Sequence, residues 1–150
     1  MKVSELLTPS LIKVGLESDE KEELFEEMVQ LFVDDGLITD REAALQALFE
    51  REAKMSTGVA KWLALPHGKL DEAEGLLLAL GTSEYGIEYD SLDGEPVHVV
   101  LMVFAEVGNP GPHIEALAEI SRLFSIPGFT EKIRGAATAA EILAAISKEE

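Results

Sequence analysis

Cysteine is absent from the sequence. Its absence excludes disulfide bonds, catalysis by a thiol and zinc held by cysteine sulfur, and it leaves the redox compartment open. Long apolar runs are absent too, because no stretch reaches the ~18 residues that a membrane-spanning helix needs. Residues 1–5 (MKVSE) lack the basic and apolar pattern of a signal peptide. We therefore expect a cytoplasmic protein with no direct membrane insertion.

Basic residues are scarce: 12 Lys and Arg stand against 29 Asp and Glu, which gives a formal net charge of −17. A chain this acidic repels the phosphates of nucleic acids and of anionic lipids, so we expect no nucleic-acid partner. Solubility alone would account for the acidity. The same charge would also steer a basic protein partner toward the surface, and composition leaves both interpretations open.

No internal repeat, low-complexity tract or long linker divides the 150 residues. A chain of this length can bury roughly 70% of the surface that its unfolded form exposes, which suffices for an independent core. We therefore expect a single domain over residues 1–150.

Apolar residues recur at helical spacing in four segments. Two of these helices have a hydroxyl and a carboxylate three residues apart at their start, Thr39 with Glu42 and Thr138 with Glu141, the spacing of a reciprocal cap. The four predicted helices cover about 18–36, 39–52, 114–124 and 138–146.

Apolar runs bounded by Gly or Pro predict strands between these helices. The runs cover 11–16, 76–80 and 97–105. The last two are continuously apolar, as is typical of strands covered on both faces. Strands interleaved with helices predict an α/β fold, in which helices pack on the faces of a sheet.

The segment 56–69 reads STGVAKWLALPHGK and ends its apolar run in Pro66, His67 and Gly68. Proline fixes one backbone angle, and glycine lets another molecule approach the main chain closely. An exposed turn histidine would be the ordinary interpretation. The flanking residues favour instead a titratable ring held on a stiff, accessible corner.

The other two histidines differ in setting. His98 opens an apolar strand and is interpreted as a core residue. His113 follows Pro112 in the first turn of a predicted helix, where the positive end of the helix disfavours an imidazolium and attracts phosphate. If the loops of His67 and His113 meet in space, one ring could attack a phosphoryl group while the other holds its oxygens.

Arg51 ends the second predicted helix just before Ser56, Thr57 and Gly58. The arginine could be a solvated cation at a helix end, or a planar fork that grips phosphate oxygens. The Ser-Thr-Gly turn could supply hydroxyl and backbone donors to the same phosphate, although such turns are common.

Several motifs carry a resemblance to one family. They stand in the family's order: Glu50-Arg51-Glu52, Ser56-Thr57-Gly58-Val59, Ala64-Leu65-Pro66-His67-Gly68-Lys69, Ser91-Leu92-Asp93-Gly94-Glu95-Pro96-Val97 and His113-Ile114-Glu115-Ala116-Leu117. The sequence resembles the enzyme IIA domain of the bacterial phosphoenolpyruvate-dependent phosphotransferase system, of the fructose, mannitol and nitrogen-regulatory type. The likeness runs from about residue 6 to residue 146.

The resemblance implies a fold and a set of roles. The fold is a central mixed β-sheet of about five strands with helices on both faces. His67 would accept a phosphoryl group from the phosphocarrier HPr and pass it to a cysteine of enzyme IIB. His113 and Arg51 would support this transfer, and Ser56, Thr57, Gly58 and Gly68 would help to bind the phosphate. No metal and no cofactor is implied.

One segment departs from the family's pattern. Ala60-Lys61-Trp62 stands where the family usually has Gly-Asn-Gly or Gly-His-Gly. The indole could alter which partner docks, and Lys61 could add a cation near phosphate. Alternatively, Trp62 merely packs at the start of the next strand.

Three functions stay open at the level of sequence. The first is a phosphocarrier in sugar uptake. The second is a nitrogen-regulatory enzyme IIA whose phosphorylation state controls binding to target proteins. The third is a hydrolase or metal site built on His67 and His113, for which the sequence has no third ligand at a suitable spacing.

Overall fold

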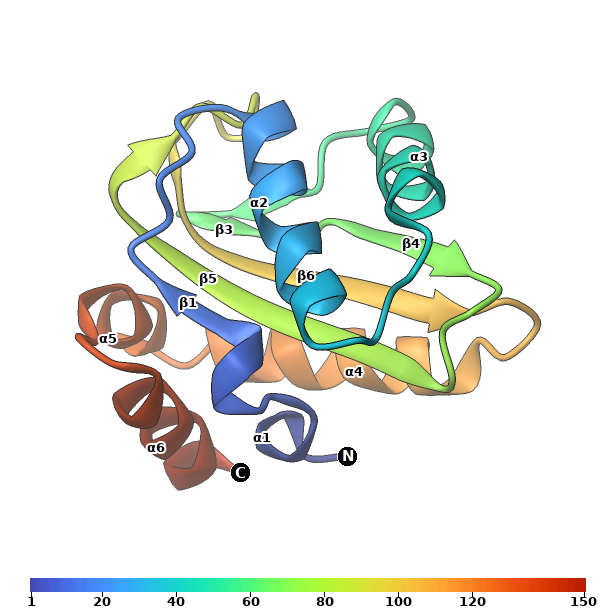
Figure 1. Ribbon diagram of the computed structural model, residues 1–150. Coiled ribbons are helices and arrows are strands. Elements are labelled where there is room, and N and C mark those ends of the chain that lie inside the picture. Colours follow the sequence, from blue (N-terminus) through green and yellow to red (C-terminus); the bar gives the residue numbers. More distant parts are fainter.

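The computed structural model describes residues 1–150 and contains a six-stranded mixed β-sheet (Figure 1). Its strands are β1 (Ile12–Val14), β2 (Gly58–Ala60), β3 (Leu63–Ala64), β4 (His67–Leu70), β5 (Leu76–Ile87) and β6 (Val97–Glu106). They follow the order β1-β5-β6-β3-β2, and β4 also pairs with β6. The predicted mixed sheet is confirmed, with one strand more than expected.

The long strand β6 organises the sheet. It runs antiparallel to β5 and parallel to both β3 and β4, which lie one after the other along it. Residues 65–66 separate β3 from β4, and Pro66 has no N–H with which to continue the ladder. His67 is therefore the first residue after a break in the sheet.

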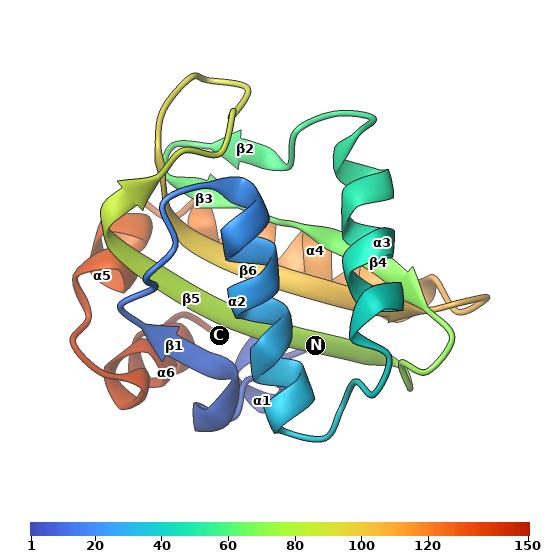
Figure 2. The same ribbon diagram turned by 45° about the horizontal axis from the view of Figure 1, so that its top comes forward.

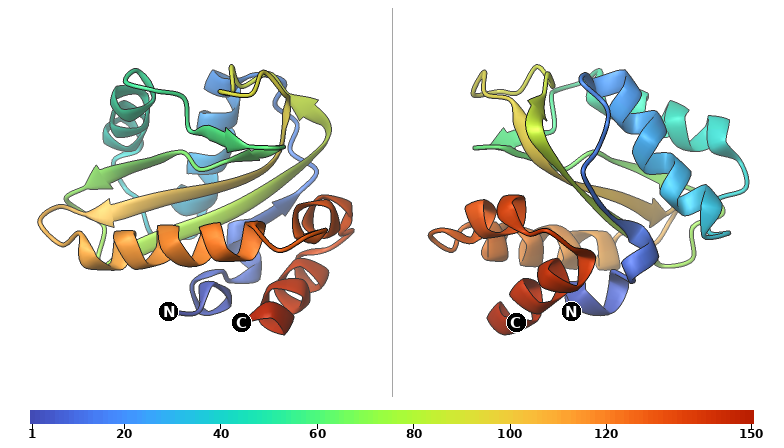
Figure 3. Two further views of the ribbon diagram at one scale, coloured as in Figure 1. Left: turned by 180° about the vertical axis from the view of Figure 1, so that it is seen from behind. Right: turned by 60° about the vertical axis from the view of Figure 1, so that its left-hand side comes forward.

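Helices cover both faces of the sheet (Figures 1 and 3). One face carries α2 (Lys21–Asp34) and α3 (Arg41–Glu52), which lie side by side (Figure 2). The other carries the remaining helices, which are α1 (Val3–Leu6), α4 (Gly111–Phe124), α5 (Phe129–Gly135) and α6 (Ala139–Glu149). Each face has its own apolar core, of 20 and 17 buried residues, so β6 is buried on both sides as its apolar sequence predicted.

The first two long helices begin later than predicted. Helix α2 begins at Lys21 and not at residues 18–19, because the carboxylate of Glu20 accepts a hydrogen bond from the N–H of Glu23. Helix α3 is capped by Asp40, whose side chain accepts from the N–H of Ala43. The predicted cap residue, Thr39, instead donates to a carboxylate from a distant loop. The predicted end of α3 at residue 52 is confirmed.

The last helix is capped as predicted. The hydroxyl of Thr138 accepts from the N–H of Glu141, whose carboxylate in turn accepts from the N–H of Ala137. Strand β5 is longer than the predicted 76–80 because its pairing with β6 continues past an irregularity to Ile87. The short helices α1 and α5 were not predicted. Among the helices, none combines the length and the apolar character needed to cross a bilayer.

Candidate active site

His67 lies at the start of β4, and its ring is held by its own chain. Its Nδ1 lies 2.9 Å from the carbonyl oxygen of Leu65. A carbonyl oxygen only accepts hydrogen bonds, so Nδ1 carries the hydrogen and Nε2 keeps its lone pair. The ring is therefore held in the tautomer in which Nε2 is the nucleophilic atom.

The rings of His67 and His113 meet, as the proposed chemistry requires. Their centroids are 5.1 Å apart and the ring planes are inclined by 59°. His113 is the third residue of α4, in the first turn, where helical N–H groups have no partner within the helix. Its Nε2 is buried and has no hydrogen-bond partner within the protein. A polar atom in this position is available to a bound group.

Both imidazoles have a pKa below the ordinary histidine value. Burial lowers the pKa of His67 most, and the positive charge of Arg51 lowers it further, against a raising effect of the hydrogen bond to Leu65. Burial likewise lowers the pKa of His113, followed by the charges of His67 and Lys69. The two rings are therefore neutral at pH 7, and their lone pairs are available.

The two histidines line a pocket of about 440 Å³ together with a group of cations. Arg51 comes from the last turn of α3, and its Nη1 donates to the carbonyl of Met55 at 2.9 Å. The full lining is Ala47, Glu50, Arg51, Lys54, His67, Gly68, Lys69 and His113. Residues from α3, β4 and α4, which are far apart in the sequence, thus line the same pocket.

Gly68 is required by close packing between β4 and α3. A Cβ added at this position would lie 2.9 Å from the Cβ of Ala47, which is closer than side chains approach. The glycine lets the arginine-bearing helix lie directly against the strand that begins with His67. Gly68 itself also lines the pocket.

The Ser-Thr-Gly turn is not part of this pocket. Thr57 is 1% exposed, and its hydroxyl contacts Glu52 and Tyr89 instead. Ser56 accepts a hydrogen bond from the N–H of Gly58. Gly58 lies against Ser91, so closely that a Cβ there would meet the serine side chain. The turn therefore lies behind the pocket wall and does not present its hydroxyls to a phosphate in this structure.

Two lining cations were missed by reasoning from sequence. Lys69 follows His67 by two residues on β4, and alternate residues of a strand share a face. Lys54 follows Arg51 by three residues, in the turn just after α3. The strand period could have singled out Lys69, whereas Lys54 lies beyond the helix and had no such signal.

The departure at Lys61 and Trp62 lies outside the pocket. Trp62 adopts the left-handed backbone conformation (φ 66°) that glycine adopts without strain. Its indole packs edge-on to His98, with the cations of Lys61 and Arg134 over the ring at 4.6 and 4.2 Å. The second interpretation of Trp62, packing at the start of a strand, agrees with these contacts.

The remaining expectations concern His98 and metals. His98 is 5% exposed and its Nδ1 donates to the carbonyl of Ser83, so its interpretation as a core residue is confirmed. No group of three or more His, Cys, Asp or Glu side chains is placed to hold a metal ion. The pocket's own chemistry is that of two neutral imidazoles beside three cations and one carboxylate, Glu50, and this excess of positive charge suits a phosphoryl group.

The fold and the pocket define an α/β protein with a histidine pair at the edge of a mixed sheet. Comparison with known proteins identifies the family. The chain belongs to the family described as phosphoenolpyruvate-dependent sugar phosphotransferase system, EIIA 2, whose model matches residues 5–149. It is thus a phosphotransferase component of that system.

Individual relatives span sugar transport and regulation. The chain is 42% identical over 123 residues to the PTS system fructose-specific EIIABC component of Bacillus subtilis, covering 82% of this chain but 19% of that protein. It is 34% identical over 113 residues to the PTS system fructose-specific EIIA component of Haloferax volcanii, covering 75% and 73%. The crystal structure of Nitrogen Regulatory Protein IIA-Ntr from Neisseria meningitidis superposes with a TM-score of 0.88 at 26% identity, covering 96% and 98%.

Proposed function

We propose that His67 accepts a phosphoryl group from phospho-HPr in the cytoplasm and passes it to a cysteine of enzyme IIB during sugar uptake. The observation that carries the proposal is the hydrogen bond from Nδ1 to the Leu65 carbonyl, which leaves Nε2 with its lone pair. The lone pair attacks phosphorus and forms the N–P bond. The bond from phosphorus to the donor breaks, and its electron pair returns to the donor.

The surrounding groups stabilise the transferring phosphoryl. Its charge is spread over three oxygens in a loose transition state, so positioning and positive charge matter more than acid–base chemistry. Arg51 supplies a planar fork, and Lys54 and Lys69 supply point charges from two sides of the pocket. The partnerless Nε2 of His113, in the tautomer that carries its hydrogen there, would donate to one oxygen.

The onward step reverses the first. A cysteine thiolate of enzyme IIB attacks phosphorus, the N–P bond breaks, and its electron pair returns to Nε2 of His67. A neutral imidazole is a good leaving group here because the low pKa of His67 disfavours a charged ring. Gly68 lines the pocket beside the ring, where a bound phosphoryl and an approaching partner need space.

Labelling with phosphoenolpyruvate, enzyme I and HPr tests the acceptor. We expect one acid-labile phosphate on the wild-type protein and none on His67→Gln. His98→Gln is the matched control, because it removes an imidazole that lies outside the pocket, and it should still be labelled. Full labelling of His67→Gln would refute the assignment.

A regulatory role is the second candidate, supported by the likeness to the Neisseria protein over 96% of the chain. In that case phosphorylation of the same histidine would change the affinity for target proteins. Adding enzyme IIB to the labelled protein separates the two roles. Rapid loss of the label to enzyme IIB supports transport, whereas retention of the label with altered binding of target proteins supports regulation.

A further inference from the structure

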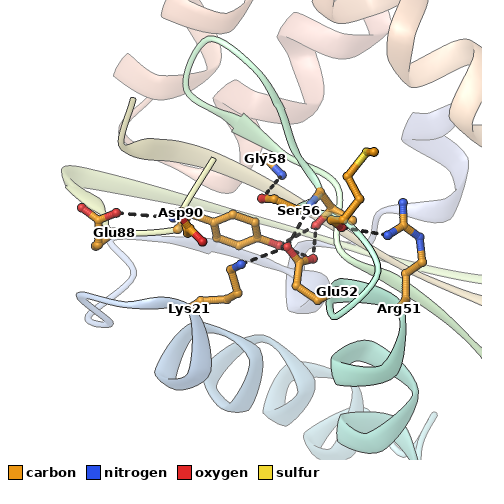
Figure 4. A network of polar contacts seen from close by, with 10 residues as sticks. Lys21, Arg51, Glu52, Ser56, Gly58, Glu88 and Asp90 are labelled. Carbon is orange, nitrogen blue, oxygen red and sulfur yellow. Dashed lines mark hydrogen bonds and ion pairs between the residues drawn. The ribbon is translucent and has the colours of Figure 1, made fainter. Parts of the chain in front are cut away.

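Glu52, the last residue of α3, is a nearly buried carboxylate within a network of polar contacts (Figure 4). Its side chain is 6% exposed, and Lys21 of α2 forms an ion pair with Oε2 at 3.1 Å. The same oxygen accepts a hydrogen bond from the N–H of Thr57 at 2.9 Å. Burying a carboxylate is costly unless its oxygens are satisfied, and here both a cation and a backbone donor satisfy it.

The second oxygen of Glu52 orders the Thr57 hydroxyl. Oε1 lies 2.5 Å from Oγ1 of Thr57, which lies 2.7 Å from the phenol oxygen of Tyr89. A carboxylate accepts only, so the threonine donates its one hydrogen to Glu52 and accepts the hydrogen of Tyr89. Burial and the charge of Glu52 raise the pKa of Tyr89, which keeps its hydrogen in place. The phenol of Tyr89 also lies 3.4 Å from Oε1 of Glu52, so the carboxylate, Thr57 and Tyr89 form one hydrogen-bonded cluster.

The main chain of Thr57 continues this network to the histidine. Its carbonyl accepts from the N–H of Leu65 at 2.9 Å. The carbonyl of Leu65 in turn accepts from Nδ1 of His67 at 2.9 Å. An unbroken series of hydrogen bonds therefore links Glu52 to the ring of His67, through two residues that do not line the pocket.

The same turn also holds Arg51. The guanidinium donates to the carbonyl of Met55, two residues before Thr57, and Arg51 directly precedes Glu52 at the end of α3. Residues 53–57 are thus a closed turn, tied at one end to the helix and at the other to the carboxylate of Glu52. Loosening Thr57 would free both the arginine's acceptor and the strand that carries His67.

We propose that Glu52, acting through Thr57, is a positioning residue for phosphoryl transfer, which holds His67 in its Nδ1–H tautomer and Arg51 at the pocket wall. This inference rests on the proposed role of His67 as the acceptor. In this proposal the Ser-Thr-Gly turn positions His67 and Arg51 and does not contact the phosphate directly. Transfer is sensitive to such positioning, because a displacement of about 1 Å can cost a factor of about 100 in rate.

The pair Thr57→Val and Thr57→Ser tests the proposal. Valine keeps the shape and removes the hydroxyl, whereas serine restores it. We expect Thr57→Val to lower kcat for transfer from phospho-HPr by about 10- to 100-fold with KM unchanged, and Thr57→Ser to restore most of the rate. A merely structural role would instead leave kcat per folded molecule at the wild-type value.

The tautomer of His67 gives a readout that needs no donor protein. Long-range 1H–15N correlation spectra of the wild type should show the hydrogen on Nδ1, and Thr57→Val should give a mixture of both tautomers. Unchanged ring nitrogen shifts in Thr57→Val would overturn the proposal, whatever the transfer rate. This NMR measurement tests how the His67 ring is positioned, and labelling tests separately which residue accepts the phosphate.

A second variant covers the case in which Thr57→Val does not fold. Tyr89→Phe removes the phenol hydroxyl that contacts Thr57 at 2.7 Å and Glu52 at 3.4 Å, and it leaves Glu52 paired with Lys21. A smaller fall in kcat, with the same change in the His67 nitrogen shifts, would support the proposal. Wild-type kcat and wild-type shifts in a folded Tyr89→Phe protein would overturn it.

Discussion

The imidazole rings of His67 and His113 lie with their centroids 5.1 Å apart, one at the start of β4 and the other in the first turn of α4. Forty-five positions of sequence separate them, and the parallel pairing of β4 with β6 brings them together. The charge of His67 lowers the pKa of His113, so the ring beside His67 favours its neutral form.

His113 is expected to assist transfer without carrying the phosphate. Because its Nε2 is the partnerless polar atom of the pocket, His113→Ala removes one group that stabilises the transition state. We expect the rate of labelling by phospho-HPr to fall by about 100-fold, with the final amount of label unchanged. Rapid-quench labelling measures both quantities. A protein that never acquires label would reverse the roles of the two histidines.

Arg51 is expected to act through the shape of its guanidinium as well as its charge. Arg51→Lys keeps the positive charge but loses the planar guanidinium and its hydrogen bond to the carbonyl of Met55. Phosphoryl transfer should therefore slow by about tenfold. Arg51→Ala should slow it further, by about 100-fold. Equal rates for the lysine variant and the wild type would show that positive charge alone suffices.

The titration of the two rings should appear in NMR spectra. Both folded pKa values are lowered from 6.5, chiefly by burial, so the midpoints of His67 and His113 should lie below 6.5. A midpoint at or above 6.5 for either ring would contradict this electrostatic picture.

Stability should follow the same shifts. At high pH both rings are neutral in the folded and unfolded states. As the pH falls below 6.5 the unfolded state takes up protons first, so the free energy of unfolding decreases until the folded pKa values are passed. Urea unfolding at pH 7.5 and 5.5 should therefore show a larger loss for the wild type than for a variant with both His67 and His113 changed to Gln.

Gly68 is expected to tolerate no side chain while Ala47 faces it. Gly68→Ala places a methyl group 2.9 Å from the Ala47 Cβ, and overpacking of this kind costs about 1–3 kcal/mol in the free energy of unfolding. Ala47→Gly alone costs about 1 kcal/mol in a helix. In the double variant the two losses should be less than additive, as measured by urea denaturation. Full additivity would show that the close approach does not limit the packing.

The α/β fold and the three principal site residues could be predicted from the sequence. Continuous apolar runs marked β5 and β6, and the corner around His67 stood out by its Pro and Gly neighbours. The meeting of His67, His113 and Arg51 could not be predicted from spacing, because it depends on how three elements pack around the edge of one sheet.

The errors came from interactions distant in sequence. Thr57 was assigned to the phosphate because its pattern fits a phosphate-binding turn, but its hydroxyl is taken by Tyr89, 32 residues away, and by Glu52. Thr39 was assigned as a helix cap, but Glu72, 33 residues away, accepts its hydrogen bonds and leaves the cap to the next residue. Local pattern offers several donors and acceptors at such points, and the tertiary fold selects among them.

The ring atom that carries the phosphate is the most direct test. After labelling by phosphoenolpyruvate, enzyme I and HPr, 1H–15N and 31P NMR spectra of the phosphoprotein identify the phosphorylated nitrogen. Because Nδ1 of His67 is engaged with Leu65, we predict a single phosphate on Nε2 of His67. A phosphate on Nδ1 of His67, or on His113, would contradict the proposed mechanism.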